Sequence, residues 1–225
     1  MEIGGLKKTS LIDFPDRIST VLFTPGCNLR CPFCHNWRLV IEPKGPFLSG
    51  EEALKILESR RKYVDAVVVT GGEPTLQPDL PDFLKKLKER MFAVKLDTNG
   101  FFPHVLERCL PYVDYVALDV KTSIKKYRML GARDVSSYLH TIEMLKRGSV
   151  DYEFRCTVVP GFVDEEDIPN IGEVVEGAKR FVFQQFIPND TLDENFRSVE
   201  PYPKELITRF SMVMKNYVND VVLRI

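Results

Sequence analysis

Three of the five cysteines lie within eight residues, as Cys27, Cys31 and Cys34 in the segment PGCNLRCPFCHNW. Three residues separate the first pair and two residues separate the second pair. A loop with this spacing can place three thiolates around one face of a cubane iron–sulfur cluster, which leaves one iron without a protein ligand. Such an iron can bind and polarise a substrate. The spacing therefore favours a cluster that takes part in chemistry.

A structural zinc site is the alternative interpretation of these cysteines, with His35 as the fourth ligand. Structural zinc sites are closed tetrahedra, usually built from paired ligands that come from two places in the chain. This chain has no second cysteine pair, and His35 directly follows Cys34, an awkward geometry for chelating one small ion. A zinc-binding interaction module remains the alternative from a different functional class.

Runs of strand-forming residues recur at intervals typical of β/α units. They lie at 18–24, 66–70, 92–98, 115–121, 152–159 and 180–187, with a last candidate at 220–224. Helical spacing of apolar residues fills the intervals, at 49–61, 79–90, 102–110, 135–147, 166–179 and 203–217. Ser49 and Glu52 predict a capping box at the first of these helices. Alternating strands and helices predict a parallel sheet with crossover helices.

The number of these units limits the fold. Six units are too few for the eight-stranded barrel, which typically needs about 250 residues. We therefore predict an α/β fold in the form of an incomplete (β/α)6 barrel, with a doubly wound open sheet as the alternative. The polar segment 190–203 is expected to be a loop or a partner-contacting segment.

Polar residues follow the carboxyl ends of the predicted strands, where parallel β/α folds place their active sites. The first strand leads into the cysteines, and the sixth ends near Asn189 and Asp190. The second, third and fourth strands end in Gly71, Gly72 and Glu73; in Asp97, Thr98 and Asn99; and in Asp119 and Lys121. We expect these groups to converge on one rim, as a cofactor site requires.

Two of these segments have a chemical rationale of their own. Consecutive glycines let the backbone approach a ligand closely, and the carboxylate of Glu73 can accept hydrogen bonds from an ammonium group. Asp97, Thr98 and Asn99 could contact a ribose, a carboxylate or a bound cation. An ordinary strand-to-helix turn is the alternative for the glycines, and a turn with a helix cap is the alternative for DTNG.

Arg155 lies inside an apolar strand, where an arginine is rarely tolerated unless it is paired. A carboxylate in the barrel interior would satisfy it with a bidentate contact. The alternative is an arginine at a strand edge that reaches solvent. Cys109, on a predicted helix, and Cys156, which faces opposite to Arg155, are expected to be buried small apolar residues.

The segment CNLRCPFC resembles the CxxxCxΦC pattern of the radical S-adenosylmethionine (SAM) superfamily, with Phe33 as the aromatic residue. The resemblance implies a [4Fe–4S] cluster on the three cysteines, whose open iron chelates SAM and whose reduced form cleaves it to methionine and a 5′-deoxyadenosyl radical. It also implies that GGEP binds the SAM amino group. FRCTVVPG resembles the strand in which an arginine, here Arg155, contacts SAM, and Lys121 matches the family's LDxK.

Within that superfamily, SLIDFPDRISTVLFTPGCNLRCPFCHN resembles the opening of the glycyl-radical-enzyme activases. Asp13 falls where these enzymes have an aspartate that contacts the partner's glycine loop. DFPD in place of DGPG is most similar to activating proteins of the anaerobic ribonucleotide reductase. The resemblance covers about residues 5–190 and implies hydrogen abstraction from a glycine of that partner. An activase of another glycyl radical enzyme, such as pyruvate formate-lyase, or a radical SAM enzyme for a small molecule is the alternative.

The same resemblance implies further components. An electron donor such as flavodoxin or ferredoxin would reduce the cluster, and a monovalent cation could lie near Asp97 and Asp119. The activases often have a SAM-contacting histidine after the sixth strand. This chain has none there, so Asn189 or Asp190 would have to replace it.

Composition supports an ordinary globular enzyme. The 225 residues fit a single domain, residues 1–225, with its core at about 15–190. Basic and acidic residues are balanced at 31 and 32, which argues against a nucleic-acid partner. The N-terminus lacks the features of a signal peptide, and no stretch approaches the roughly 20 apolar residues of a membrane span. We expect a cytoplasmic protein without a membrane partner.

Overall fold

The computed structural model describes residues 1–225. The chain forms two compact units. The first comprises residues 1–28, 36–98 and 102–116, and the second comprises 29–35, 99–101 and 117–225. The chain thus enters the second unit briefly at the cysteine loop and again after the third parallel strand. The expectation of a single domain stays a prediction.

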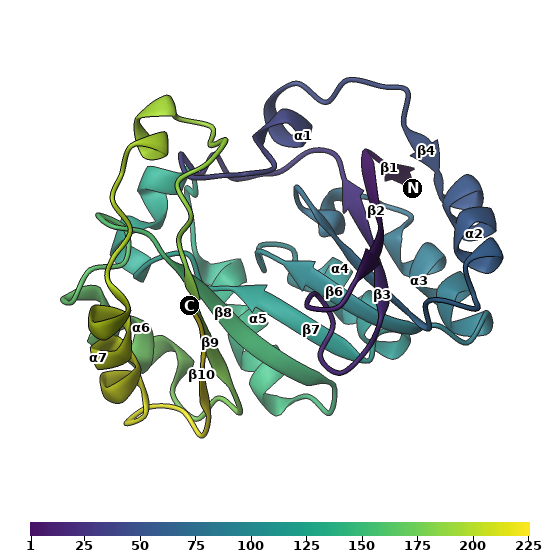
Figure 1. Ribbon diagram of the computed structural model, residues 1–225. Coiled ribbons are helices and arrows are strands. Elements are labelled where there is room, and N and C mark those ends of the chain that lie inside the picture. The colour runs from purple at the N-terminus through teal and green to yellow at the C-terminus, as the bar shows by residue number, and fades with distance from the viewer. The chain divides into compact units, whose positions relative to one another are not determined.

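Four strands form the sheet of the first unit, in the order β2-β3-β5-β6 (Figure 1). They are β2 (Gly5–Ser10), β3 (Ser19–Thr24), β5 (Ala66–Gly71) and β6 (Ala93–Thr98). β2 is antiparallel to β3, whereas β3, β5 and β6 are parallel. A separate antiparallel pair joins β1 (Glu2–Ile3) to β4 (Leu48–Ser49).

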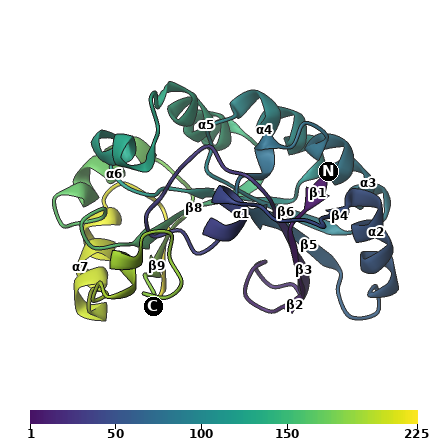
Figure 2. The same ribbon diagram turned by 90° about the horizontal axis from the view of Figure 1, so that it is seen from above.

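Helices cover one face of these strands. They are α2 (Gly50–Ser59), α3 (Leu80–Glu89) and α4 (Pro103–Cys109), which lie side by side in Figure 2. The short α1 (Trp37–Ile41) lies apart from them, beyond the ends of the strands in Figure 1. The predicted capping box of α2 is confirmed, because Ser49 Oγ accepts from the Glu52 amide at 3.2 Å and the Ser49 amide donates to Glu52 Oε2 at 2.8 Å. α3 buries Phe83, Leu84 and Leu87 at helical spacing.

A loop covers part of the other face. Phe14, in the connection between β2 and β3, is buried and packs with Val21, Val68 and Tyr115. The sequence did not predict this role, or β2 itself, because GLKKTS has no clear apolar alternation. Burial of an aromatic ring fixes this connection on the sheet.

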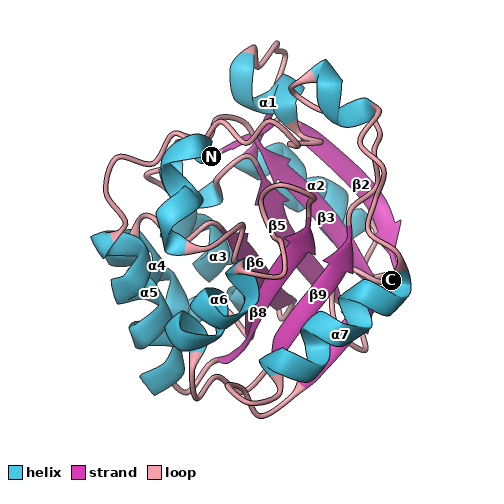
Figure 3. Cartoon of the chain, turned by 90° about the vertical axis from the view of Figure 1, so that its left-hand side faces the viewer, coloured by secondary structure: helices cyan, strands magenta, loops and turns pink.

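The second unit, described by itself, also consists of strands and helices. Its strands are β7 (Tyr115–Asp119, which starts in the first unit), β8 (Asp151–Val158), β9 (Phe181–Gln185) and β10 (Val221–Arg224), in the order β7-β8-β9-β10. β9 is parallel to both β8 and β10. Its helices are α5 (Ser136–Arg147), α6 (Asp167–Val175) and α7 (Lys204–Met214), and Figure 3 shows α7 alongside β9.

Chain order gives six strands that are each followed by a helix, namely β3, β5, β6, β7, β8 and β9, and the pairs β3-β5, β5-β6 and β8-β9 are parallel. This confirms the six predicted β/α units. Two predicted strands are too long, because β7 ends at Asp119 and β9 ends at Gln185. The helix predicted at 166–179 ends at Val175, since Gly177 takes the left-handed conformation at φ +78°.

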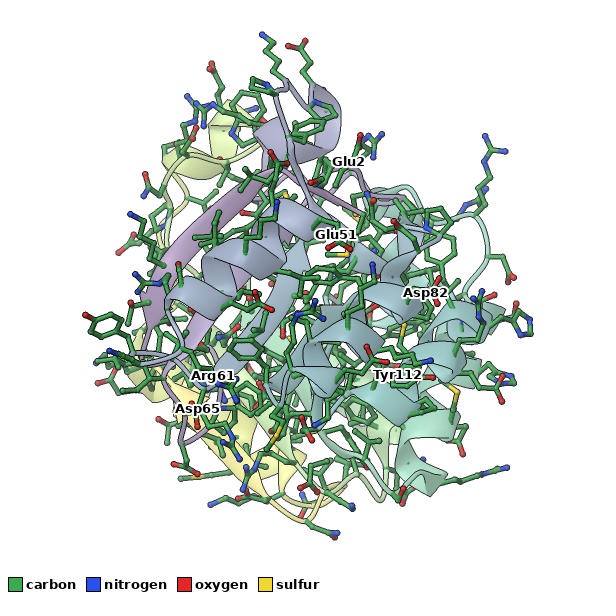
Figure 4. The ribbon with its side chains drawn as sticks, turned by 90° about the vertical axis from the view of Figure 1, so that its right-hand side faces the viewer. Glu2, Glu51, Arg61, Asp65, Asp82 and Tyr112 are labelled. Atoms are coloured by element: carbon green, nitrogen blue, oxygen red, sulfur yellow. The ribbon has the colours of Figure 1, made fainter.

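The outer face of the first unit's helices is charged (Figure 4). Glu51 on α2 pairs with Lys86 on α3, and Arg61 donates to the Met91 carbonyl at 2.8 Å. Exposed pairs of this kind contribute little to stability, so this face mainly serves solvation. None of the helices is long and apolar enough to span a membrane.

Candidate active site

The cysteine loop begins where β3 ends. Gly26 has a left-handed φ of +82°, and its amide donates to the Leu39 carbonyl at 2.8 Å. The Gly26 carbonyl accepts from the Glu73 amide, also at 2.8 Å. Cys27 follows directly and is half-buried. Backbone hydrogen bonds therefore attach the first cysteine to the segment that follows β5.

Cys31 and Cys34 lie in the second unit. The Cys34 amide donates to the Cys31 carbonyl at 3.1 Å, which closes a turn. The Leu192 amide donates to the Cys34 carbonyl at 3.2 Å, and the Asp193 amide to the Pro32 carbonyl at 2.9 Å. The polar segment after β9 thus holds the backbone of this turn. None of the five cysteines forms a disulfide, which leaves the thiols chemically suited to bind metal.

The residues beside these cysteines are anchored by aromatic contacts. The ring of Phe33 lies 5.1 Å from that of Phe162 and 6.2 Å from that of Phe196, centroid to centroid. His35 Nε2 hydrogen-bonds the carbonyl of Ile187 at 3.0 Å. This bond fixes the orientation of the imidazole ring beside Cys34.

The two glycines at the end of β5, Gly71 and Gly72, allow a close approach between backbones. Gly71 has φ +117°, and a Cβ on Gly72 would lie 1.9 Å from the Gly26 carbonyl oxygen. Only glycine fits at such a distance. Asn36 Nδ2 also donates to the Gly71 carbonyl at 2.8 Å. In the structure, the backbone that Gly72 approaches is therefore that of the cysteine loop.

Glu73 is fully buried. Its Oε1 accepts from the Thr75 amide at 3.1 Å, from the Thr75 hydroxyl, and from Thr98 Oγ1 at 2.7 Å. These bonds fix the orientation of the carboxylate and join the ends of β5 and β6. The sequence analysis did not single out Thr75. Its position two residues after Glu73 could have indicated a hydroxyl close enough to bond that carboxylate.

Asp97 and Asn99 have different surroundings. Asp97 is 8% exposed, and its Oδ1 lies 2.9 Å from Nζ of Lys95. The sequence analysis did not single out Lys95. Its position two residues before Asp97, on the same face of a predicted strand, could have indicated that the two side chains are neighbours. The Phe101 amide donates to Asn99 Oδ1 at 3.2 Å, which is the local turn contact of the alternative interpretation.

Asp119, Lys121 and Arg155 form an ion-pair cluster in the second unit. Arg155 Nε and Nη2 lie 2.9 and 2.8 Å from Asp119 Oδ1, and Lys121 Nζ lies 3.0 Å from Oδ2. The prediction that Arg155 pairs with a carboxylate is confirmed, and the solvent-reaching alternative is wrong, since this side chain is 16% exposed. Burial opposes ionisation of Asp119, but Arg155 and Lys121 outweigh it and lower its pKa to about 2.

Arg155 and Lys121 place two cationic groups beside the carboxylate of Asp119, a setting that suits an anionic ligand group. An aromatic layer supports it. The Lys121 amide donates to the buried Tyr127 hydroxyl at 3.1 Å, and Tyr138 lies beside Tyr127 with ring centroids 4.9 Å apart. Burial raises the pKa of both phenols, which keeps them neutral.

Three further sequence candidates are Asp13, Cys109 and Cys156. The carboxylate of Asp13, after β2, accepts from Lys7 at 3.3 Å and from the Ser10 hydroxyl. Cys109 and Cys156 are fully buried, as expected, and burial raises the pKa of Cys109 to about 12.

Comparison with known proteins identifies this arrangement. The pattern of the radical SAM superfamily matches residues 21–171. The chain belongs to the radical SAM superfamily. A protein of Methanocaldococcus jannaschii, provisionally named a glycyl-radical enzyme activating enzyme, is 38% identical, with 99% of this chain and 95% of that protein covered. The pyruvate formate-lyase-activating enzyme of Clostridium pasteurianum is 30% identical, with 95% and 96% covered. The chain is thus a radical SAM enzyme of the glycyl-radical-enzyme activase family.

The solved structure of a radical SAM methyltransferase from Sphaerobacter thermophilus has the same fold. Its TM-score is 0.71 at 14% sequence identity, with 95% of this chain and 69% of the methyltransferase covered. Together with the parallel strand order and the six β/α units, this likeness confirms the predicted fold class. Radical SAM membership also implies a [4Fe–4S] cluster and SAM as cofactors.

Proposed function

We propose that this radical SAM enzyme abstracts hydrogen from a glycine of the anaerobic ribonucleotide reductase. The observation that carries the proposal is the 38% identity to a glycyl-radical enzyme activating enzyme across 99% of the chain. DFPD ahead of β3, in place of DGPG, favours the reductase as the target. When bound, the cluster and SAM together supply the 5′-deoxyadenosyl radical.

We assign the metal site to Cys27, Cys31 and Cys34. The donor set fits an iron–sulfur cluster, because three thiols, none of them in a disulfide, lie within eight residues of a loop. The left-handed Gly26 and the turn from Cys31 to Cys34 shape the backbone that carries these ligands.

We assign SAM binding to groups that lie in the strands or just after them: Gly71, Gly72, Glu73, Asp97, Thr98, Asn99, Asp119, Lys121 and Arg155. The cationic groups of Arg155 and Lys121 suit the carboxylate of SAM, and the backbone of Gly71 and Gly72 suits its ammonium group. The buried carboxylate of Glu73, held by Thr75 and Thr98, fixes the turn that carries this backbone. Asp97 and Asp119 are the candidate ligands of a monovalent cation. Each already has a cationic side chain as a partner, so such an ion would share these oxygens.

The remaining assignments concern partners. We propose that the Asp13 segment meets the glycine loop of the reductase, and that flavodoxin or ferredoxin reduces the enzyme in the cytoplasm. Pyruvate formate-lyase is the second candidate target, because relatives from C. pasteurianum and, at 25% identity, from Escherichia coli are named for its activation.

The test is anaerobic reconstitution with iron and sulfide, followed by reduction and addition of SAM. We would quantify 5′-deoxyadenosine and the glycyl radical, by electron paramagnetic resonance, with each candidate partner and with a Cys31→Ala control. The proposal expects a radical on the reductase that the control abolishes. A radical on pyruvate formate-lyase alone would show that this enzyme, and not the reductase, is the target. SAM cleavage without a radical on either partner would overturn the proposal.

A further inference from the structure

Lys95 is a buried cation that the proposed chemistry does not use. It lies on β6 opposite Val68 of β5, and its side chain is 2% exposed. A lysine is almost never fully buried unless its ammonium group is paired. Here the ammonium group contacts Asp97 Oδ1 at 2.9 Å and the carbonyl oxygen of Asp13 at 2.7 Å.

These two contacts join segments that are far apart in the sequence. Asp13 lies 82 residues before Lys95, in the connection between β2 and β3. Asp97 lies on the same face of β6 as Lys95, because side chains alternate along a strand. One ammonium group thus ties a carboxylate at the end of β6 to the backbone of the β2–β3 connection.

The Asp13 segment is held on several sides. Lys95 binds its backbone carbonyl, and the next residue, Phe14, is buried in the sheet core. The Asp13 carboxylate points elsewhere, toward Lys7 and the Ser10 hydroxyl, and its side chain is 37% exposed. A fixed backbone therefore presents a partly exposed carboxylate. This is the property that a recognition residue needs, because little entropy remains to be lost on binding.

We propose that Lys95 is a positioning residue that couples Asp97 of the cofactor site to the Asp13 segment. Its ammonium group compensates the buried charge of Asp97 and at the same time fixes the carbonyl of Asp13. A ligand that contacts Asp97 then restricts Lys95 and, through it, further stabilises the segment that meets the partner. The assignment of these two sites rests on the proposed function.

Replacement of Lys95 by methionine breaks both links with a side chain of similar length. Asp97 loses a buried counter-charge, and the Asp13 carbonyl loses a donor. Lys95→Arg keeps the charge and is the rescue variant. Lys8→Met is the matched control, because Lys8 lies on β2 of the same hairpin with an exposed side chain.

Hydrogen–deuterium exchange of the reconstituted enzyme, without any partner, tests the coupling. We expect SAM to slow exchange at residues 11–18 in the wild type, in Lys8→Met and in Lys95→Arg, and to leave it unchanged in Lys95→Met. An equal SAM effect in Lys95→Met, or no SAM effect in the wild type, would overturn the coupling. This readout does not depend on which partner the enzyme activates.

Kinetics with the glycyl radical partner provide the second readout, through a double-mutant cycle. Asp13→Asn should raise the KM for the partner about tenfold in the wild type but less than threefold in Lys95→Met, because the loosened segment no longer presents the carboxylate. If Asp13→Asn raises the KM by the same factor in the wild type and in Lys95→Met, Lys95 has only a structural role. Failure of the wild type to activate any partner would refute the proposed function, while the exchange result still decides the role of Lys95.

Discussion

The carboxylate of Asp119 makes the stability of the fold depend on pH. Its carboxylate is held by Arg155 and Lys121, and its pKa falls from an ordinary 3.8 to about 2 despite burial. A carboxyl group whose pKa is lower in the folded than in the unfolded state stabilises the fold above the unfolded pKa. This contribution, roughly 2 kcal/mol, is lost as the pH falls through the interval between these two values.

We therefore predict that the wild type loses stability steeply between about pH 4 and pH 2. Asp119→Asn should be less stable at neutral pH, because Arg155 then lacks its carboxylate, and should show a shallower loss in that interval. Urea unfolding at a series of pH values, followed by circular dichroism, measures both effects. Parallel pH profiles for the two proteins would contradict this account.

The sequence identified Arg155 but not its partner. An arginine within FRCTVV must be paired, and this follows from solvation alone. Which carboxylate pairs with it depends on strand neighbours and register, which bring Asp119 of β7 to β8. Lys95 was not predicted to be a site residue for a related reason. A lysine on a strand is usually exposed, and only the fold shows the oxygens around its ammonium group.

At the scale of elements, the turn after β5 depends on the absence of a side chain. A Cβ at Gly72 would overlap the Gly26 carbonyl at 1.9 Å, and backbone cannot move aside as a flexible side chain can. The same turn carries the amide of Glu73, which donates to that carbonyl at 2.8 Å. A side chain at position 72 would therefore displace the start of the cysteine loop.

Gly72→Ala should reduce the free energy of unfolding by about 1–3 kcal/mol and lower the iron content after reconstitution. Gly5→Ala is the matched control, because its Cβ would lie 3.6 Å from Phe23, an ordinary contact distance. Denaturant unfolding and iron analysis of both variants, prepared in parallel, give the comparison. Equal iron content in the two variants would show that the turn does not shape the cysteine loop.

Periodicity predicted the parallel strands and their helices because each has a distinct apolar pattern over several residues. It failed for β2, whose exposed Lys7 and Lys8 leave little apolar signal. Such lysines suit an edge strand, where charge opposes pairing with other chains. The polar segment 190–203 was predicted as a loop, but its backbone bonds to the turn from Cys31 to Cys34 could not be inferred from composition.

At the scale of the whole molecule, the fold and the family follow from features that the radical SAM superfamily shares. The cysteine spacing, the GGEP segment and the β/α alternation all concern the cofactors and their scaffold. The choice of partner depends instead on exposed residues, where physical constraints on the sequence are weaker. The sequence therefore predicts the chemistry of the superfamily more directly than the identity of the partner.

The exposed residues that bear on the target are Leu11 and Ile12, which precede Asp13. They are 72% and 79% exposed, whereas Phe14 next to them is buried. Two adjacent apolar side chains on an anchored loop indicate a contact surface. If the Asp13 segment meets the partner, both side chains should become buried in the complex.

We predict that Leu11→Ser combined with Ile12→Ser raises the KM for the glycyl radical partner about tenfold and leaves partner-independent SAM cleavage unchanged. A tenfold change corresponds to about 1.4 kcal/mol, well within the value of two buried aliphatic side chains. Met212→Ser on α7, where the methionine is 62% exposed, is the control. Because both variants remove exposed apolar groups, equal KM values would place the partner contact elsewhere on the molecule.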